Sequence, residues 1–318
     1  MPFLPISHVP LGSQDLLADD VRLLRRIQSA WYALAEARGY EEVFTRGSGP
    51  ELASRLLRFV DQDGRLVALR ADFTSSIARV AASRLAGASL PLRLCYAGKV
   101  FRQEAAGEGR RREMFQLGAE LIGDASAEAD VEVIRLLIDT LHAVGITDFQ
   151  VNLGNVEFVR SLLAGVSFDE AEALRLAIDR KDRAALAAAV AGGEIDRAAG
   201  RSLVELPTLI GRREVLERAA ELAIDAAAAA AIERLARIDG LLTETERQHI
   251  VYDLGEIRGL GYYTGIQFEV FAAGAGRAIG VGGRYDQLLA LYGADRPAIG
   301  FALETDALSA LLAQGARR

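Results

Sequence analysis

The stretch FRQEAAGEGRRREMFQLGAELIG, residues 101–123, decides the fold, because two strand-like segments flank a polar, glycine-containing loop. On the second segment Gln116 and Glu120 are four residues apart, so the period of two along a strand puts both side chains on one face. Arg102 and Glu104 share a face of the first segment for the same reason. A hairpin that gathers polar groups on one face favours a binding surface, and a solvated hairpin with surface salt bridges is the alternative.

The sequence on either side predicts further strands and two amphipathic helices. Apolar residues recur at helical spacing over residues 19–38 before Gly39, and again over residues 126–144 before Gly145. Trp31 lies on the first apolar stripe, which predicts a place in the core or at a dimer interface. Alternating Val, Phe, Tyr and Leu predict strands at residues 40–45, 65–73, 93–104, 114–123 and 148–154. The chain therefore reads as an α+β protein whose antiparallel sheet is flanked by helices.

Composition changes near residue 160, where alanine becomes dominant and aromatic residues nearly vanish until about residue 240. This pattern predicts a helical insertion, and strand-like sequence resumes at residue 250 and is followed by a last helix from Thr305. We therefore expect three parts: a first core segment (1–158), a helical insertion subdomain (159–242) and a second core segment (243–318).

Charge, cysteine and histidine content narrow the function classes. The 318 residues carry 37 Lys and Arg against 44 Asp and Glu, and a net charge of −7 disfavours a protein whose main task is to bind nucleic acid. The single cysteine, Cys95, lies in strand-like sequence and reads as a buried structural thiol. No signal peptide or membrane span is recognisable, so we expect a cytoplasmic protein. The three histidines are isolated in sequence, which predicts no metal site: His8, His142 and His249.

Two glycine-rich segments near the C-terminus also carry polar side chains. They are IRGLGYYTGIQFE, residues 257–269, and GVGGRYDQLLALYG, residues 280–293. Glycine weakens a strand unless another backbone or a ligand needs the space, so these segments favour close approach to a ligand or to a neighbouring strand. The GGRYD string is equally compatible with a tight entry into a helix.

Together these strings resemble the class II aminoacyl-tRNA synthetases, in the form of the histidyl-tRNA synthetases. FRQEAAGEGRRREMFQ is similar to motif 2, RGLGYYTG and GGRYD to the two histidine signatures, LRADFTSSIAR (69–79) to the amino-acid-binding segment and AIGFALETDAL (298–308) to motif 3. The strings occur in the family's order over nearly the whole chain. The resemblance implies a class II aminoacyl-tRNA synthetase-like antiparallel sheet with flanking helices.

The same resemblance implies a site for free histidine. It assigns Asp72, Thr74 and Gln116 to the α-ammonium group, which donates hydrogen bonds and therefore needs acceptors. It assigns Glu120, Tyr263 and Tyr285 to the neighbourhood of the imidazole. Arginine forks bind carboxylates, which fits the two arginines that it places at the ligand's carboxylate. The full predicted histidine-binding set is Asp72, Thr74, Arg102, Gln116, Glu120, Arg258, Tyr262, Tyr263 and Tyr285.

Departures from the synthetase pattern argue against aminoacylation. Ala307 stands where motif 3 has an ATP-binding arginine, and the nearby carboxylates of Glu304 and Asp306 are expected to repel a triphosphate. Gly261 replaces the aspartate of the RGLDYY form, and Arg46 replaces the motif 1 proline. The arginine run 110–112 reads as a remnant ATP loop, a partner contact or a solvated turn. The chain ends soon after motif 3, which predicts no anticodon-binding domain.

A histidine site without an ATP clamp resembles the regulatory subunits of the short-form ATP phosphoribosyltransferases, which belong to histidine biosynthesis. This resemblance implies a non-catalytic subunit without a cofactor, which pairs with the short catalytic subunit, self-associates as a dimer, takes L-histidine as a feedback effector and binds no tRNA. Two alternatives stay open. One is a truncated ligase that activates histidine as histidyl-adenylate. The other is a stand-alone binding protein that senses histidine or tRNA-like ligands without a phosphoribosyltransferase partner.

Overall fold

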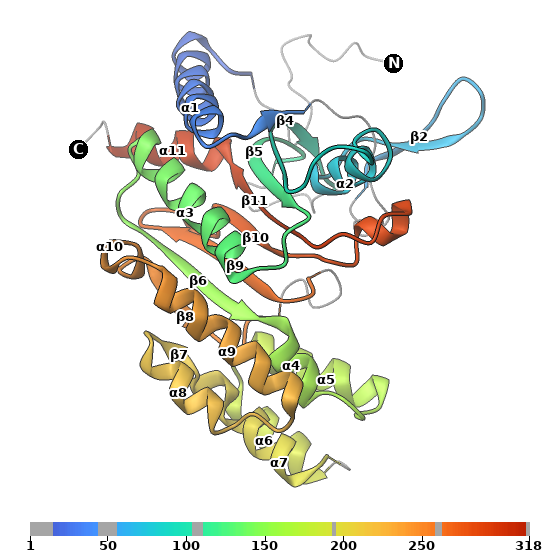
Figure 1. Ribbon diagram of the computed structural model, residues 1–318, viewed down its shortest axis with the longest axis vertical. Coiled ribbons are helices and arrows are strands. Elements are labelled where there is room, and N and C mark those ends of the chain that lie inside the picture. The colour runs from blue at the N-terminus through green and yellow to red at the C-terminus, as the bar shows by residue number, and fades with distance from the viewer. Residues whose placement is uncertain (1–14, 44–55, 104–110, 193–194, 258–262, 316–318) are drawn as a thin grey trace, which may run out of the picture.

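A nine-stranded mixed sheet forms the centre of the protein (Figure 1). The computed structural model describes residues 15–43, 56–103, 111–192, 195–257 and 263–315. In spatial order the strands are β1 (Glu41–Glu42), β4 (Leu92–Phe101), β5 (Glu113–Ile122), β11 (Ala298–Glu304), β10 (Gly280–Arg284), β9 (Ile266–Ala272), β6 (Phe149–Asn155), β8 (Ile250–Asp253) and β7 (Ile210–Gly211). The central strands come from both ends of the chain, so the two core segments complete one sheet.

The expected antiparallel sheet is confirmed across its centre and is wrong at two places. The pairs from β4 through β5, β11, β10 and β9 to β6 are all antiparallel. However, β1 pairs with β4 in parallel, and so does β6 with β8. A parallel pair needs a long crossover, and helices intervene in the chain between the two strands of each of these pairs.

Three helices cover one face of the sheet and bury the main core. They are α1 (Ala18–Ala37), α3 (Ala127–Val144) and α11 (Thr305–Gly315). The α3 helix begins and ends as expected, because the Ser126 hydroxyl accepts a hydrogen bond from the Ala129 amide (3.2 Å) and Gly145 adopts φ 94°. Trp31 of α1 is completely buried, donates from Nε1 to the Tyr96 carbonyl (3.2 Å) and packs edge-on against a core ring, so it belongs to the core of one chain.

A helical layer occupies the other end of the molecule, at the bottom of Figure 1. We use this name for α4 (Val156–Leu162), α5 (Phe168–Asp179), α6 (Arg183–Gly192), α7 (Arg197–Glu205), α8 (Glu214–Ala220) and α9 (Ala226–Leu241). The α9 helix packs against α3, α4 and α8, and the short α10 (Glu244–Arg247) leads back to β8. Because β7 lies in this stretch and pairs with β8, the helical layer also adds an edge strand to the main sheet.

The opposite face of the sheet is covered differently. The α2 helix (Thr74–Ser83) and the 3-10 turn η3 (Leu289–Tyr292) pack against each other over a second, smaller core cluster that includes Phe73, Tyr96 and Tyr285. The strands β2 (Arg58–Val60) and β3 (Leu66–Ala68) form a separate hairpin that projects from the body (Figure 1). Within the described ranges, no helix combines the length and apolar character needed to cross a bilayer.

Candidate functional site

One face of the central sheet combines polar side chains with very small residues. The β4–β5 and β5–β11 registers place Gln116, Gly118 and Glu120 on the same face as their cross-strand partners. The partners on this polar face are Gly98, Tyr96 and Leu94 on β4, Glu304, Ala302 and Gly300 on β11, Gly283 on β10, Gln267 on β9 and Gly154 on β6. Several of these small residues leave space for neighbouring side chains of the face, because a Cβ atom on Gly98, Gly118 or Gly300 would meet Phe73, Tyr96 or Glu120.

Glu120 is the centre of this polar face. Its side chain is 1% exposed, and its carboxylate accepts hydrogen bonds from the Thr74 hydroxyl (2.8 Å) and the Tyr285 hydroxyl. Burial raises the pKa of Glu120 to about 8, although both hydroxyl hydrogen bonds lower it, and the charge of Asp72 adds to the increase. A Cβ atom on Gly300 would lie 1.7 Å from the Glu120 Oε2, so only glycine leaves space for the carboxylate.

The segment before α2 brings Asp72 and Thr74 to the polar face. Asp72 Oδ1 accepts a hydrogen bond from the Ser75 amide (3.2 Å) at the start of the helix. Phe73, between them, is buried and stacks on the Tyr96 ring with centroids 4.5 Å apart. The stacked pair therefore fixes the helix start against β4 and turns Thr74 toward Glu120.

Tyr263 and Tyr285 come from the two glycine-rich segments and lie on either side of Arg284. The Tyr285 side chain is 2% exposed and follows β10 directly, while Tyr263 precedes β9. A Cβ atom on Gly283 would lie 2.8 Å from the Tyr263 ring, so that ring rests directly on β10. Burial and then the charge of Glu120 raise the pKa of Tyr263, which keeps this phenol protonated as a hydrogen-bond donor.

The remaining predicted residues lie elsewhere on this face, at its edge or outside the described residues. Gln116 is 3% exposed, and its Oε1 has no hydrogen-bond partner among the described residues. Arg102 donates from Nε to the Ala71 carbonyl (3.0 Å) at the edge of the face. Arg258 and Tyr262 lie outside the described residues. The structure thus brings together Asp72, Thr74, Glu120, Tyr263 and Tyr285, with Gln116 on the same sheet face.

Sequence reasoning missed several residues of the polar face. Gln267 is 2% exposed with its Oε1 unpartnered among the described residues, and Glu269 is two positions further along β9. Their signal was present in the string IQFEVFA, where polar residues alternate with apolar ones. Tyr96 was also missed, and burial followed by the charge of Glu120 raises the pKa of its phenol. Nothing in its strand-like surroundings distinguished it from an ordinary core tyrosine.

The two carboxylates of the motif 3 stretch are each engaged by arginines. Glu304 lies 4.0 Å from Arg102 Nη1 and 2.5 Å from Arg277 Nη2. Asp306 accepts a hydrogen bond from the Phe115 amide (2.9 Å) and lies 3.3 Å from Arg111 Nη1. These acids therefore neutralise the neighbouring guanidinium groups within the chain.

The arrangement suits a small cationic ligand with several donors. The acceptors of the polar face are the buried Glu120 and Glu269 carboxylates, the half-buried Asp72 and Thr74 side chains and the buried carbonyls of Gln116 and Gln267. The Tyr96, Tyr263 and Tyr285 phenols stand beside them. An ammonium group has three donors and no acceptor, and an imidazole needs a partner at each ring nitrogen. A free amino acid with a nitrogen-containing ring matches both requirements.

The sheet, its polar face and the flanking helices define a histidyl-tRNA synthetase-like class II fold. In agreement, the family model described as histidyl-tRNA synthetase matches residues 12–308. A solved structure described as an ATP phosphoribosyltransferase regulatory subunit/histidyl-tRNA synthetase from Bacillus halodurans superposes with a TM-score of 0.89 at 30% identity, covering 96% of this chain and 83% of that one. The fold predicted from the resemblance is thereby confirmed.

The sequence comparison identifies the branch of that class. A protein named ATP phosphoribosyltransferase regulatory subunit from Syntrophotalea carbinolica is 42% identical over 94% of this chain and 73% of its own length. The chain belongs to the family of ATP phosphoribosyltransferase regulatory subunits, which are not independent catalysts. A structure described as a histidine–tRNA ligase subunit from Alicyclobacillus acidocaldarius is also similar, with a TM-score of 0.78 and 32% identity over 97% of this chain and 98% of that one.

Proposed function

We propose that this chain binds L-histidine on the polar face of its sheet and thereby regulates a separate catalytic subunit of ATP phosphoribosyltransferase. The observation that carries the proposal is the buried Glu120 carboxylate, held by the Thr74 and Tyr285 hydroxyls in a member of the regulatory-subunit family. A carboxylate with so high a pKa gains from a cationic or donor-rich ligand, because such a ligand compensates for its burial. The catalytic subunit then depends on this chain for activity, and histidine inhibits the complex.

The proposed histidine site includes all nine predicted residues. Asp72, Thr74 and Gln116 accept from the α-ammonium, and Glu120, Tyr263 and Tyr285 surround the imidazole. Arg102 and Arg258 are assigned to the carboxylate, and Tyr262 completes the set. The Oε1 of Gln116, which has no partner in the part of the chain that the structure describes, supports this assignment, since a buried amide oxygen without a partner is costly and a ligand ammonium would satisfy it.

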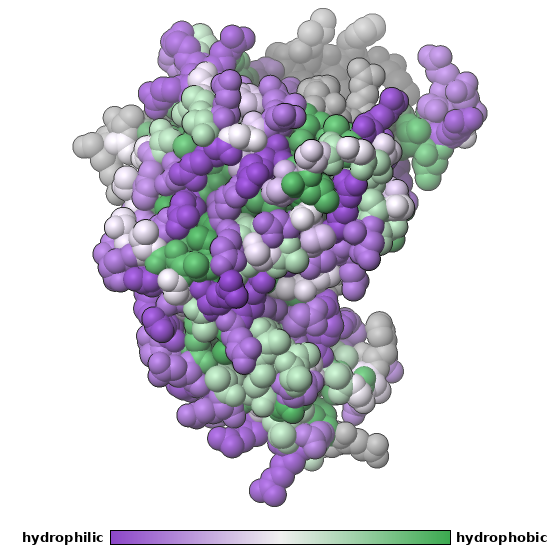
Figure 2. Space-filling view, in the orientation of Figure 1, coloured by the Kyte–Doolittle hydropathy of each residue, from purple (hydrophilic) through white to green (hydrophobic). Residues whose placement is uncertain are grey.

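Self-association as a dimer belongs to the same proposal. The β2–β3 hairpin exposes Phe59 (49%), Val60 (65%) and Leu66 (67%), and Figure 2 shows hydrophobic residues at the base of this projection and hydrophilic ones at its tip. Large apolar side chains exposed together favour a protein partner. Val60 and Leu66 are cross-strand partners on one face of the hairpin. Replacing both with Ser should shift the protein from dimer to monomer in analytical ultracentrifugation, and an unchanged mass would remove the hairpin from the interface.

The proposed complex works in the cytoplasm without tRNA or a cofactor. A single cysteine, Cys95, is buried and needs no oxidising compartment. The net charge of −7 disfavours tRNA as a partner, because phosphate binding relies on an excess of Lys and Arg. The helical insertion (159–242) is proposed as a subdomain between two core segments (1–158 and 243–318).

The decisive assay is phosphoribosyl-ATP formation by a short catalytic subunit, measured with and without this chain across a histidine titration. Activation by the chain and inhibition by histidine are the expected results. Replacing Glu120 with Ala should abolish the inhibition and leave assembly intact, while Glu233→Gln, an exposed change on α9, should leave both unchanged. Absence of both activation and complex formation would refute the proposal.

A second function has one observation in its favour. The similar Alicyclobacillus structure is described as a histidine–tRNA ligase subunit, which keeps histidine activation open as an alternative. Exchange of pyrophosphate into ATP that depends on histidine would support that reading. Ala307, together with the internal pairing of Glu304 and Asp306, favours regulation instead.

A further inference from the structure

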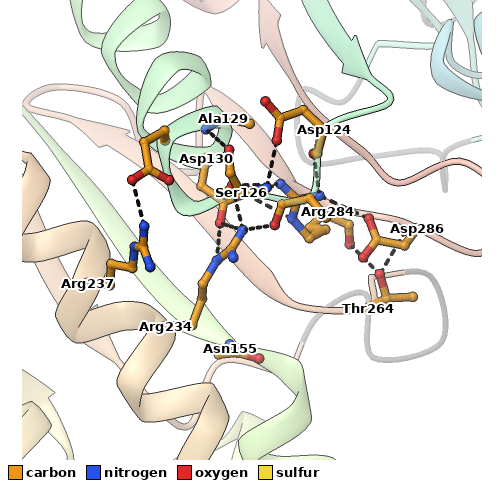
Figure 3. Close-up of polar contacts among 12 residues, drawn as sticks. Asp124, Ser126, Ala129, Asp130, Asn155, Arg234, Arg237, Thr264, Arg284 and Asp286 are labelled. Carbon is orange, nitrogen blue, oxygen red and sulfur yellow. Dashed lines mark hydrogen bonds and ion pairs between the residues drawn. The ribbon is translucent and has the colours of Figure 1, made fainter. Parts of the chain in front are cut away.

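A fully buried carboxylate joins the helical layer to the strands of the polar face. Asp130 of α3 has no exposed surface, and its two oxygens bind guanidinium groups from opposite sides (Figure 3). Arg284 of β10 donates to Oδ1 from Nε (2.9 Å) and Nη2 (2.5 Å). Arg234 of α9 donates from Nε to Oδ2 (2.6 Å). We call Asp130, Arg284 and Arg234 the charged triad.

Arg284 connects the triad to the two segments that carry Tyr263 and Tyr285. Its carbonyl accepts a hydrogen bond from the Thr264 amide (2.7 Å), directly after Tyr263 in the chain. The Asp286 amide donates to the Thr264 hydroxyl (2.8 Å), and the Asp286 carboxylate accepts from Arg284 Nη1 (3.1 Å). These bonds tie the residues on both sides of Tyr285 to Thr264, and the Tyr285 hydroxyl donates to the Glu120 carboxylate. A displaced Arg284 would therefore move both phenols.

Arg234 connects the triad to the helical layer. Besides Asp130, its Nη2 donates to the carbonyls of Ala125 (2.8 Å) and Ser126 (2.7 Å) at the start of α3. A second arginine of the helical layer makes a similar link, because Arg160 of α4 donates to the Tyr263 carbonyl (3.0 Å). The helical layer thus contacts the segment of Tyr263 directly through Arg160 and reaches the segment of Tyr285 through Arg234, Asp130 and Arg284.

The charges of the triad make its geometry depend on both arginines. A buried carboxylate that loses one charged partner keeps its desolvation cost, so its remaining partner must supply more of the compensation. Two guanidinium groups share Asp130, and Arg284 also binds Asp286, so removal of Arg234 shifts the balance at Arg284. Because Arg284 adjoins Tyr285, that shift reaches the polar face.

We propose that the helical layer sets the histidine affinity through the charged triad, with Arg234 and Arg284 as positioning residues for Tyr263 and Tyr285. This inference rests on the proposed histidine site and adds a role for the helical layer, which the family's name does not assign. The position of α9 and the occupancy of the histidine site would then be thermodynamically coupled. Any partner that moves α9 relative to α3 would change the affinity of the site, and histidine would in turn favour one position of α9.

The test compares two arginines of the same helix. Arg237 lies one turn after Arg234 on α9 and pairs with Glu128 at the surface, where the two side chains are 64% and 53% exposed. L-Histidine binding to the full chain is measured by titration calorimetry. We expect about tenfold weaker binding in Arg234→Ala, by analogy with the loss of residues that orient a ligand's direct partners. Arg237→Ala should stay within about twofold of wild type. Arg234→Lys should recover part of the loss, because an ammonium restores the charge but not the fork.

Amide hydrogen exchange separates failure of this inference from failure of the proposed function. If wild type binds no histidine, the proposed function is wrong, and faster exchange over residues 263–266 and 284–286 in Arg234→Ala than in Arg237→Ala still supports the triad. Equal histidine affinities and equal exchange in the two variants overturn the inference. If Arg234→Ala does not fold, Arg234→Lys carries the same comparison with a smaller expected change.

Discussion

Replacing Glu120 with Gln should remove a pH dependence from the stability of the protein. The carboxylate is 1% exposed, and burial raises its pKa to about 8 from the ordinary value of 4.5. Between these two pH values the folded protein holds a proton at Glu120 that the unfolded chain has released. The free energy of unfolding of wild type therefore falls as the pH rises through this window, and the full penalty is present above pH 8. Glutamine has nearly the same volume and does not titrate.

The magnitude follows from the distance between the two pKa values. Each pKa unit corresponds to ~1.4 kcal/mol, so the rise from 4.5 to about 8 gives a ceiling of roughly 5 kcal/mol for the pH-dependent penalty. The Thr74 and Tyr285 hydroxyls donate to different oxygens of Glu120. The hydroxyl oxygen of the protonated acid can still accept a hydrogen bond, whereas the nitrogen of a glutamine amide cannot, so one of the two hydroxyls would lose its acceptor. We therefore expect the substitution to cost about 1–3 kcal/mol at pH 5, where wild type is protonated, and to cost less or to stabilise at pH 8.5.

Urea denaturation of the ligand-free protein between pH 5 and pH 8.5 measures this effect. Titrating groups that do not interact with Glu120 contribute equally to wild type and variant, so the difference between the two free energies of unfolding isolates Glu120 and its coupling to Asp72. Glu233→Gln removes an exposed carboxylate from α9 and should follow wild type across the whole range. Parallel curves for wild type and Glu120→Gln would show that Glu120 does not titrate in this window and would refute the reasoning.

Two further substitutions test the crowding and the charge of the polar face. Gly300→Ala should cost about 1–3 kcal/mol of stability and prevent histidine binding, because its Cβ would lie 1.7 Å from the Glu120 Oε2. Gly276→Ala, where a Cβ meets nothing within 4 Å, is its control, and thermal melting with calorimetry measures both; equal effects would contradict the crowding argument. Glu304→Gln should strengthen histidine binding by up to about fivefold, because it releases the Arg102 guanidinium 4.0 Å away for the ligand carboxylate, and unchanged calorimetric affinity would place that carboxylate elsewhere.

Local features of the fold could be predicted from sequence, because they depend on neighbouring residues. The period of two placed Gln116 and Glu120 on one face, and the β5–β11 register confirms it. Ser126 and Gly145 marked the ends of α3 for reasons of capping and backbone conformation. The resemblance extended this by naming Thr74 and Tyr285, which hydrogen-bond Glu120 from 46 and 165 residues away.

Long-range pairings could not be predicted from residue patterns. Asp130 and Arg284 are 154 residues apart and look like ordinary charged residues in their own segments. Asp130 lies in sequence that predicts its helix, whereas the GGRYD string was also compatible with a helix entry and Arg284 in fact ends β10. Only the folded chain brings the two side chains into contact. Glu304 was expected to repel a triphosphate, and its internal ion pair with Arg277 depends on a turn geometry that no sequence pattern specifies.

The two faces of the sheet have different roles: one supplies packing energy, and the other carries the proposed regulatory site. The face under α1, α3 and α11 is filled with apolar side chains, and its packing energy supports a polar face that is costly to bury. Glu120 remains there at a cost that the proposed cationic ligand would reduce, so that ligand would change the free energy of this region more than that of the rest of the chain. Regulation at a distance requires such a difference between two states of the protein. Tyr285 donates to Glu120, and its neighbour Arg284 donates to Asp130, which also binds Arg234 of α9. The proposed effector site and the helical layer are therefore connected through two consecutive residues of the chain.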